Sequence, residues 1–111
     1  MLGIHYIGKI KGCNLSYLKS NKKIKSIMQN VAKKSNLDII KKTSHQFHGP
    51  KAATYCLLLS QSHFVVHTWP EHNILAFDLF SCGSQKQAEK AISLLKKEIE
   101  GKSLEIKRLS L

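Results

Sequence analysis

The stretch SHFVVHTWPEHNILAFDLFSC, residues 62–82, contains two runs that are typical of half-buried β-strands. The first run is SHFVVHTW (62–69), the second is NILAFDLFSC (73–82), and a segment around PEHN separates them. This connection is longer than the tightest hairpin loop, but it still joins neighbouring antiparallel strands. We therefore predict a hairpin whose second strand runs back to the start of the first.

Side chains alternate along the first strand of this hairpin, so the strand has two chemically different faces. One face carries His63, Val65, His67 and Trp69, and the other carries Ser62, Phe64, Val66 and Thr68. Because the returning strand ends at Cys82, this cysteine lies near Ser62 and His63. The hairpin is therefore expected to bring a hydroxyl, an imidazole and a thiol to one end of the sheet.

Four further strands are predicted outside the hairpin, because each segment is rich in β-branched or apolar residues and is bounded by turn residues. They cover residues 3–12, 37–47, 54–60 and 103–109. Gly49 and Pro50 interrupt the chain between the second and third of these segments, and proline lacks the amide hydrogen that a strand ladder uses. A turn is therefore expected there.

Two amphipathic helices are predicted from apolar residues with helical spacing. The first lies within residues 14–36, where the apolar stripe consists of Ile24, Ile27, Met28 and Val31. The second begins after Ser84, which lies three residues before Gln87 in a capping-box pattern, and it ends at Gly101. Each helix thus has one face that a sheet must cover.

These elements follow the order β-α-β-β-β-β-α-β, and residues 1–111 have the length of a single domain. Two helices with one apolar face each can cover only one side of a sheet this wide. We therefore predict an α+β fold, a two-layer sandwich with a mainly antiparallel β-sheet and two helices on one face. The uncovered face of the sheet must then contact solvent or another subunit.

The basic composition of the chain bears on its partners. The net charge of +11 comes from 18 basic and 7 acidic residues, and seventeen of the basic residues are lysines spread along the chain. Nucleic-acid recognition usually relies on arginine, and Arg108 is the only arginine. We therefore expect a solvated basic surface and no nucleic-acid partner.

The cysteines and the apolar segments bear on the location of the protein. Three cysteines without a Cys-x-x-Cys pair argue against a disulfide framework and fit a reducing, cytoplasmic environment. Lys9 and Lys11 interrupt the first apolar residues, which argues against a signal peptide. No apolar run is long enough to span a membrane, so no membrane partner is expected.

Single residues of the hairpin support no specific chemistry. His63 and His67 have a spacing seen in zinc sites, but no glutamate follows His63 and the intervening residues favour a strand, so no metal site is expected. Ser62 lacks the flanking glycines of a hydrolase nucleophile turn. Each residue alone fits a packed hairpin with satisfied polar groups, and only the combination is distinctive.

The combination resembles a known family. LLLSQSHFVVHTWPE (57–71) followed by FDLFSCG (77–83) is similar to the central motif of the prokaryotic-type S-adenosylmethionine decarboxylases. GIHYIGKIKGC (3–13) and HQF (45–47) resemble further segments of the family, so the resemblance covers nearly the whole chain.

The resemblance implies an enzyme that makes its own cofactor, a pyruvoyl group derived from Ser62. The Ser62 hydroxyl would attack the backbone carbonyl of Gln61, where the family usually has glutamate, and the resulting ester would eliminate and hydrolyse. The chain would then consist of residues 1–61 and residues 62–111, the second beginning with the pyruvoyl group. The ketone of this group would form a Schiff base with S-adenosylmethionine and accept the electrons released with carbon dioxide.

The same resemblance implies roles for other positions. These are His67 and Thr54 in processing, Cys82 as the proton donor, Phe47 in stacking on adenine, Glu71 in binding the ribose hydroxyls, and Trp69 beside the same pocket. Thr54 stands where the family has a serine, and it keeps the hydroxyl group. The family also implies a homodimer, or a dimer of processed chain pairs, with active sites near the subunit contact.

Three functions are compatible with the sequence. The first is decarboxylation of S-adenosylmethionine, which supplies aminopropyl groups for spermidine. The second is pyruvoyl-dependent decarboxylation of ornithine or arginine on the same fold, although Phe47 and Glu71 suit an adenosyl substrate better. The third is an unprocessed, non-catalytic binding protein.

Overall fold

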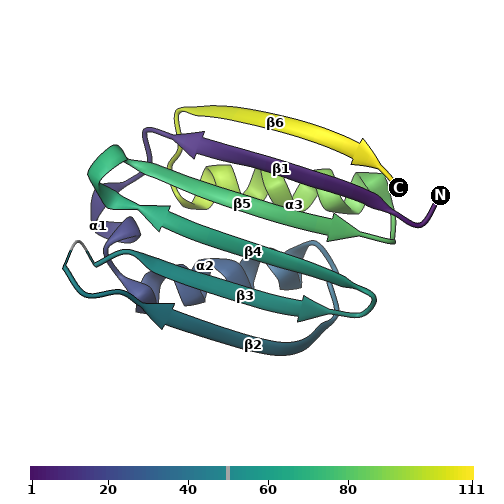
Figure 1. The fold of residues 1–111 in the computed structure, drawn as a ribbon, viewed down its shortest axis with the longest axis horizontal. Coiled ribbons are helices and arrows are strands. Elements are labelled where there is room, and N and C mark those ends of the chain that lie inside the picture. The colour runs from purple at the N-terminus through teal and green to yellow at the C-terminus, as the bar shows by residue number, and fades with distance from the viewer. Residues whose placement is uncertain (50) are drawn as a thin grey trace.

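The computed structural model describes residues 1–49 and 51–111, which form a six-stranded sheet and three helices (Figure 1). The strands are β1 (Ile4–Lys11), β2 (Ile39–Gln46), β3 (Ala53–Leu59), β4 (Ser62–Trp69), β5 (Ile74–Ser81) and β6 (Ser103–Ser110). The helices are α1 (Leu15–Leu18), α2 (Asn21–Lys34) and α3 (Gln85–Glu98), and the 3₁₀ turn η1 (Pro70–His72) joins β4 to β5.

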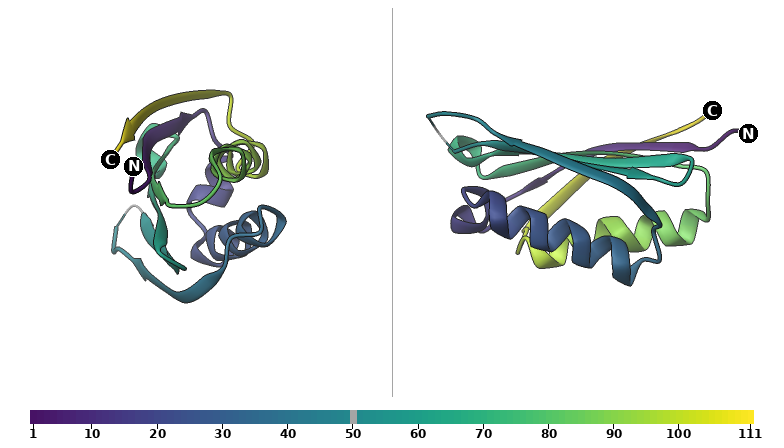
Figure 2. Two further views of the ribbon diagram at one scale, coloured as in Figure 1. Left: turned by 90° about the vertical axis from the view of Figure 1, so that its right-hand side faces the viewer. Right: turned by 90° about the horizontal axis from the view of Figure 1, so that it is seen from below.

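The sheet has the strand order β2-β3-β4-β5-β1-β6, and all neighbouring strands are antiparallel. β4 and β5 form the predicted hairpin, with His63 opposite Phe80 and Trp69 opposite Ile74. Figure 2 shows α2 and α3 side by side along one face of the sheet. The predicted α+β sandwich with a mainly antiparallel sheet is confirmed.

The core lies between the sheet and the helices, and the alternation along the strands decides which side chains enter it. Phe64 and Val66 of β4 and Leu79 of β5 are fully buried. Met28 of α2 and Leu95 of α3 are fully buried as well. Full burial of a side chain of this size contributes about 1.5–3 kcal/mol, so the pattern that sets the strand faces also stabilises the sandwich.

The structure divides the predicted helical segment 14–36 into α1 and α2. Ser20 has an extended backbone, and its side-chain oxygen accepts a hydrogen bond from the Lys23 amide. A serine in this position caps the start of a helix, so α2 begins a new helix there. The predicted cap of α3 is confirmed, because Ser84 Oγ accepts a hydrogen bond from the Gln87 amide. None of the helices in the described ranges is both long enough and apolar enough to cross a bilayer.

The connection between β2 and β3 contains the predicted turn. Gly49 has a φ of 87°, a left-handed conformation that glycine adopts without steric cost. Pro50, the other residue on which the turn prediction rested, lies outside the described residues.

The sheet face away from the helices, here called the open face, carries apolar side chains on neighbouring strands. Half-exposed side chains on it are Ile7, Leu58, Trp69 and Leu109. The strand register adds Val65 and Phe80, which are partly buried, between these positions. Apolar side chains that gather on one face in this way are typical of an interaction surface.

Cys13 offers a test of the packing between the start of α1 and the sheet. Its side chain is 4% exposed, and its thiol donates a hydrogen bond to the Ile10 carbonyl over 3.3 Å. Burial raises the pKa of Cys13 to about 11, so the thiol is both covered and protonated at pH 8. A protonated thiol reacts slowly, because the thiolate is the nucleophile.

We therefore predict that iodoacetamide at pH 8 modifies the exposed Cys82 in the folded protein and modifies Cys13 only after unfolding. Peptide mass spectrometry of samples quenched over time measures both rates. Equal rates at Cys13 and Cys82 in the folded protein would contradict the packing described here.

Candidate active site

Ser62 and Cys82 lie together at the open end of the β4–β5 hairpin, away from the η1 turn that joins the two strands. The Cys82 amide donates a hydrogen bond to Ser62 Oγ over 3.2 Å, and the Cys82 thiol donates one to the carbonyl oxygen of Gln61 over 2.5 Å. Cys82 thus contacts both the hydroxyl and the carbonyl that flank the Gln61–Ser62 peptide bond. Such contacts can orient a nucleophile and polarise the carbonyl that it attacks.

The backbone at Gln61 is strained. Ser60 and Gln61 form a two-residue turn between β3 and β4, in which Leu59 pairs with Ser62. Gln61 has a φ of 57°, a left-handed conformation that costs residues other than glycine roughly 1–2 kcal/mol. Sequence reasoning did not identify this strain, although a turn of two residues between strands commonly requires a positive φ.

Thr54 and His67 form a second polar pair. The register of β3 and β4 places them directly opposite each other on the open face, and Thr54 Oγ1 lies 2.9 Å from His67 Nδ1. This hydrogen bond fixes the orientation of the imidazole ring. His67 is exposed, so its other nitrogen is free to meet a group outside the chain.

A pocket of about 310 Å³ lies beside this pair and collects the predicted substrate residues. Phe47, Trp69 and Glu71 line it together with Thr54 and His67. Phe47 and Trp69 are each 49% exposed, so the apolar walls of the pocket are open to a ligand. Two aromatic walls with a carboxylate nearby can hold a flat ring and hydrogen-bond to hydroxyl groups.

The structure separates the two halves of the predicted site within one chain. Ser62 and His67 are five residues apart on β4, which corresponds to roughly 17 Å along an antiparallel strand. They also point to opposite faces, since an odd number of residues separates them. Ser62 and Cys82 therefore form one group, whereas Thr54, His67 and the pocket form another.

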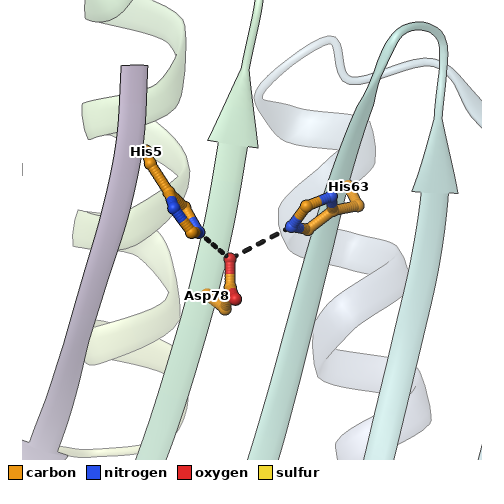
Figure 3. Close-up of side chains that lie close together, drawn as sticks. All are labelled: His5, His63 and Asp78. Atoms are coloured by element: carbon orange, nitrogen blue, oxygen red, sulfur yellow. Dashed lines mark hydrogen bonds and ion pairs between the residues drawn. The ribbon is translucent and has the colours of Figure 1, made fainter. Parts of the chain in front are cut away.

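A third group consists of His5 of β1, His63 of β4 and Asp78 of β5 on the open face (Figure 3). Asp78 Oδ1 lies 2.5 Å from His5 Nε2 and 3.1 Å from His63 Nε2. Sequence reasoning missed His5 and Asp78. The signal that could have found them is the alternation of β5, because Asp78 is a carboxylate on a strand between two strands that carry histidines.

The environment of Asp78 decides its charge. Burial alone raises the pKa of this carboxyl, but the hydrogen bonds and positive charge of His5 and His63 outweigh burial and hold the pKa below its ordinary value. Asp78 is therefore ionised at neutral pH. Among the described residues, these three side chains are also the group whose ligand atoms lie close enough together to hold a metal ion.

Comparison with known proteins identifies the family of the chain. The sequence model described as S-adenosylmethionine decarboxylase matches residues 4–110. A crystal structure of the adenosylmethionine decarboxylase from Aquifex aeolicus VF5 superimposes with a TM-score of 0.89 at 27% identity, covering 97% of this chain and 88% of that one.

Curated relatives agree with this match. The S-adenosylmethionine decarboxylase proenzyme of Sulfurihydrogenibium sp. (strain YO3AOP1) is 31% identical over 96% of this chain and 79% of its own length. The proenzyme of Thermodesulfovibrio yellowstonii is 35% identical over 91% of this chain and 74% of its own length. The chain described here therefore belongs to the S-adenosylmethionine decarboxylase family.

Proposed function

We propose that the chain cleaves itself between Gln61 and Ser62 and then decarboxylates S-adenosylmethionine with the pyruvoyl group that Ser62 becomes. The observation that carries this proposal is the double contact of Cys82, whose amide holds Ser62 Oγ and whose thiol holds the Gln61 carbonyl oxygen. The product would be the aminopropyl donor of spermidine synthesis, made in the cytoplasm.

Cleavage follows from the groups around the Gln61–Ser62 bond. Ser62 Oγ adds to the Gln61 carbonyl carbon, and negative charge develops on the oxygen to which the Cys82 thiol already donates. Collapse of this adduct moves the acyl group from nitrogen to oxygen and can release the left-handed strain at Gln61. Loss of the Ser62 α-proton then breaks the ester, and hydrolysis of the new end gives ammonia and a ketone.

The new ketone at residue 62 supplies an electron sink for the electrons that carbon dioxide leaves behind. Cys82 lies beside the same residue, and its thiol is released from the Gln61 carbonyl when the chain end departs. The thiol can then donate its proton to the substrate carbon. Processing and turnover thus use the same cysteine in succession.

His67 and Thr54 would act across a subunit contact. They lie on the open face, roughly 17 Å along the strand from Ser62, so they cannot reach Ser62 of their own chain. Packing two open faces around a two-fold axis can bring the His67 end of one chain to the Ser62 end of the other. The exposed apolar side chains Ile7 and Leu58 would be covered by the same contact.

The pocket favours an adenosyl substrate over ornithine or arginine. Phe47 and Trp69 offer aromatic walls for an adenine ring and a sulfonium cation, and Glu71 offers a carboxylate to ribose hydroxyls. Ornithine and arginine have no ring to place between these walls. The chain carries a charge of +11, which repels a cationic substrate at long range, so a local carboxylate is needed.

Ser62→Ala removes the hydroxyl that starts the proposed reaction. We predict that this variant folds but releases no carbon dioxide from carboxyl-labelled S-adenosylmethionine, whereas the wild-type protein does. Ser16→Ala, which changes an exposed serine of α1, serves as the matched control and is expected to keep full activity. Decarboxylation by Ser62→Ala at the wild-type rate would refute the cofactor assignment.

A mixture of two inactive variants tests whether the site is shared. Ser62→Ala and His67→Ala are each expected to remain uncleaved as homodimers. In a mixed dimer, the His67→Ala chain keeps its own Ser62 and meets an intact His67 from its partner, so this chain is expected to cleave.

Differently tagged chains refolded together and resolved by denaturing electrophoresis measure this rescue. If mixed dimers form but neither tagged chain is cut, the assignment of His67 to the partner's Ser62 is wrong.

Glu71→Gln tests the substrate assignment. Loss of a charged hydrogen-bond acceptor costs about 1.5–3 kcal/mol, so the KM for S-adenosylmethionine should rise about ten- to a hundredfold with a smaller change in kcat. Glu100→Gln, an exposed position outside the pocket, is the control. An unchanged KM for S-adenosylmethionine, together with turnover of ornithine or arginine, would favour the alternative substrates.

A further inference from the structure

The His5–Asp78–His63 group is fixed by the sheet and is not used by the chemistry described so far. Strand β5 lies between β4 and β1, and both histidines are paired with Phe80, two residues from Asp78. The Phe80 ring packs against both imidazoles, with centroids 6.1 Å from His5 and 6.0 Å from His63. Three strands and one aromatic ring therefore hold the group in place.

The carboxylate decides the tautomer of both rings. An ionised carboxylate only accepts hydrogen bonds, so the Nε2 atoms of His5 and His63 that approach Asp78 Oδ1 must each carry a hydrogen. The atom of each ring that gains or loses a proton is then Nδ1. Figure 3 shows the second nitrogen of His63 turned back toward its own strand, away from Asp78.

These contacts indicate a hydrogen-bonded network in preference to a metal site. Both Nε2 atoms are already engaged by the carboxylate, and 2.5 Å between His5 Nε2 and Asp78 Oδ1 is a hydrogen-bond distance. Neighbouring ligand atoms around an ion with bonds of about 2.1 Å lie roughly 3 Å apart or more. A metal ion would have to break the contacts that define the group.

His63 is the residue next to the proposed ketone. Its backbone nitrogen forms the peptide bond to residue 62, so its ring and the reactive carbon belong to adjacent residues. The titratable groups in contact with it are Asp78 from β5 and His5 from β1, whereas β3 places the apolar Leu58 opposite it. Cys82, beyond the end of β5, contacts the neighbouring residues 61 and 62. Cys82 is assigned to protonation of carbon and His67 to processing, so neither residue is yet assigned to proton transfer at the substrate nitrogen.

Resting on the proposed function, we infer that His63 is the proton-transfer residue for attachment of the substrate amine at residue 62, and that Asp78 and His5 are its positioning residues. The amine nitrogen bonds to the ketone carbon, and one of its protons moves to the former ketone oxygen. His63 Nδ1–H then protonates this hydroxyl, the C–O bond breaks, and water leaves. The second proton of the nitrogen returns to Nδ1, so atoms and charge balance.

Asp78→Asn tests the inference because it keeps the shape of the side chain and removes its charge. The contacts of Cys82 with residues 61 and 62 are untouched, so the variant should still cleave. Trapping of substrate on the new chain end with cyanoborohydride should slow at least tenfold. The pH profile of trapping should also differ from that of the wild-type protein, because the carboxylate no longer stabilises positive charge on the ring that transfers the proton.

Two further variants control this experiment. Asp78→Glu restores the charge and is expected to recover much of the trapping rate and the wild-type pH profile, which a merely structural role would not require. Glu105→Gln removes another carboxylate of the open face, one paired with Lys9 and Lys11, and should leave the trapping rate and its pH profile unchanged.

The outcomes separate this inference from the proposed function. If the wild-type protein cleaves and decarboxylates, and Asp78→Asn shows the wild-type trapping rate and pH profile, the inference alone is overturned. If Asp78→Asn folds but does not cleave, the inference is overturned as well, because the His5–Asp78–His63 group would then serve processing. Wild-type protein that never cleaves overturns the proposed function, and the inference with it.

Discussion

The pairing of β4 with β5 is the constraint on which the rest of the structure depends. It brings Cys82 to the Gln61–Ser62 bond and sets Asp78 beside His63. A shift of the register by one residue would exchange the two faces of β4, burying the histidines and exposing the core side chains. The burial of Phe64 and Val66 therefore stabilises the register that the site requires.

The sheet gives the site two distant halves, and this division explains features that are otherwise costly. The Ser62 end carries the left-handed backbone of Gln61, whereas the pocket end is open and aromatic. A single chain leaves apolar side chains exposed on the open face and, on the proposed function, would leave His67 without a reacting group. Two open faces in contact would cover the apolar surface and complete both sites at once, so folding, assembly and chemistry would be coupled.

Periodicity predicted the sandwich because the burial of side chains depends on position along each strand. The hairpin also predicted that Cys82 meets Ser62. The sequence pattern did not predict three features: the helix break at Ser20, the left-handed backbone of Gln61, and the contact of His5 with Asp78. The first two depend on local backbone geometry, and the third depends on β1 pairing with β5, which joins residues distant in sequence.

The mass of freshly purified wild-type protein under denaturing conditions tests the central claim most directly. The account predicts two chains, residues 1–61 and residues 62–111, the second lacking the serine amine and gaining two hydrogen atoms on treatment with borohydride. A single species of 12.5 kDa that borohydride does not change would contradict it.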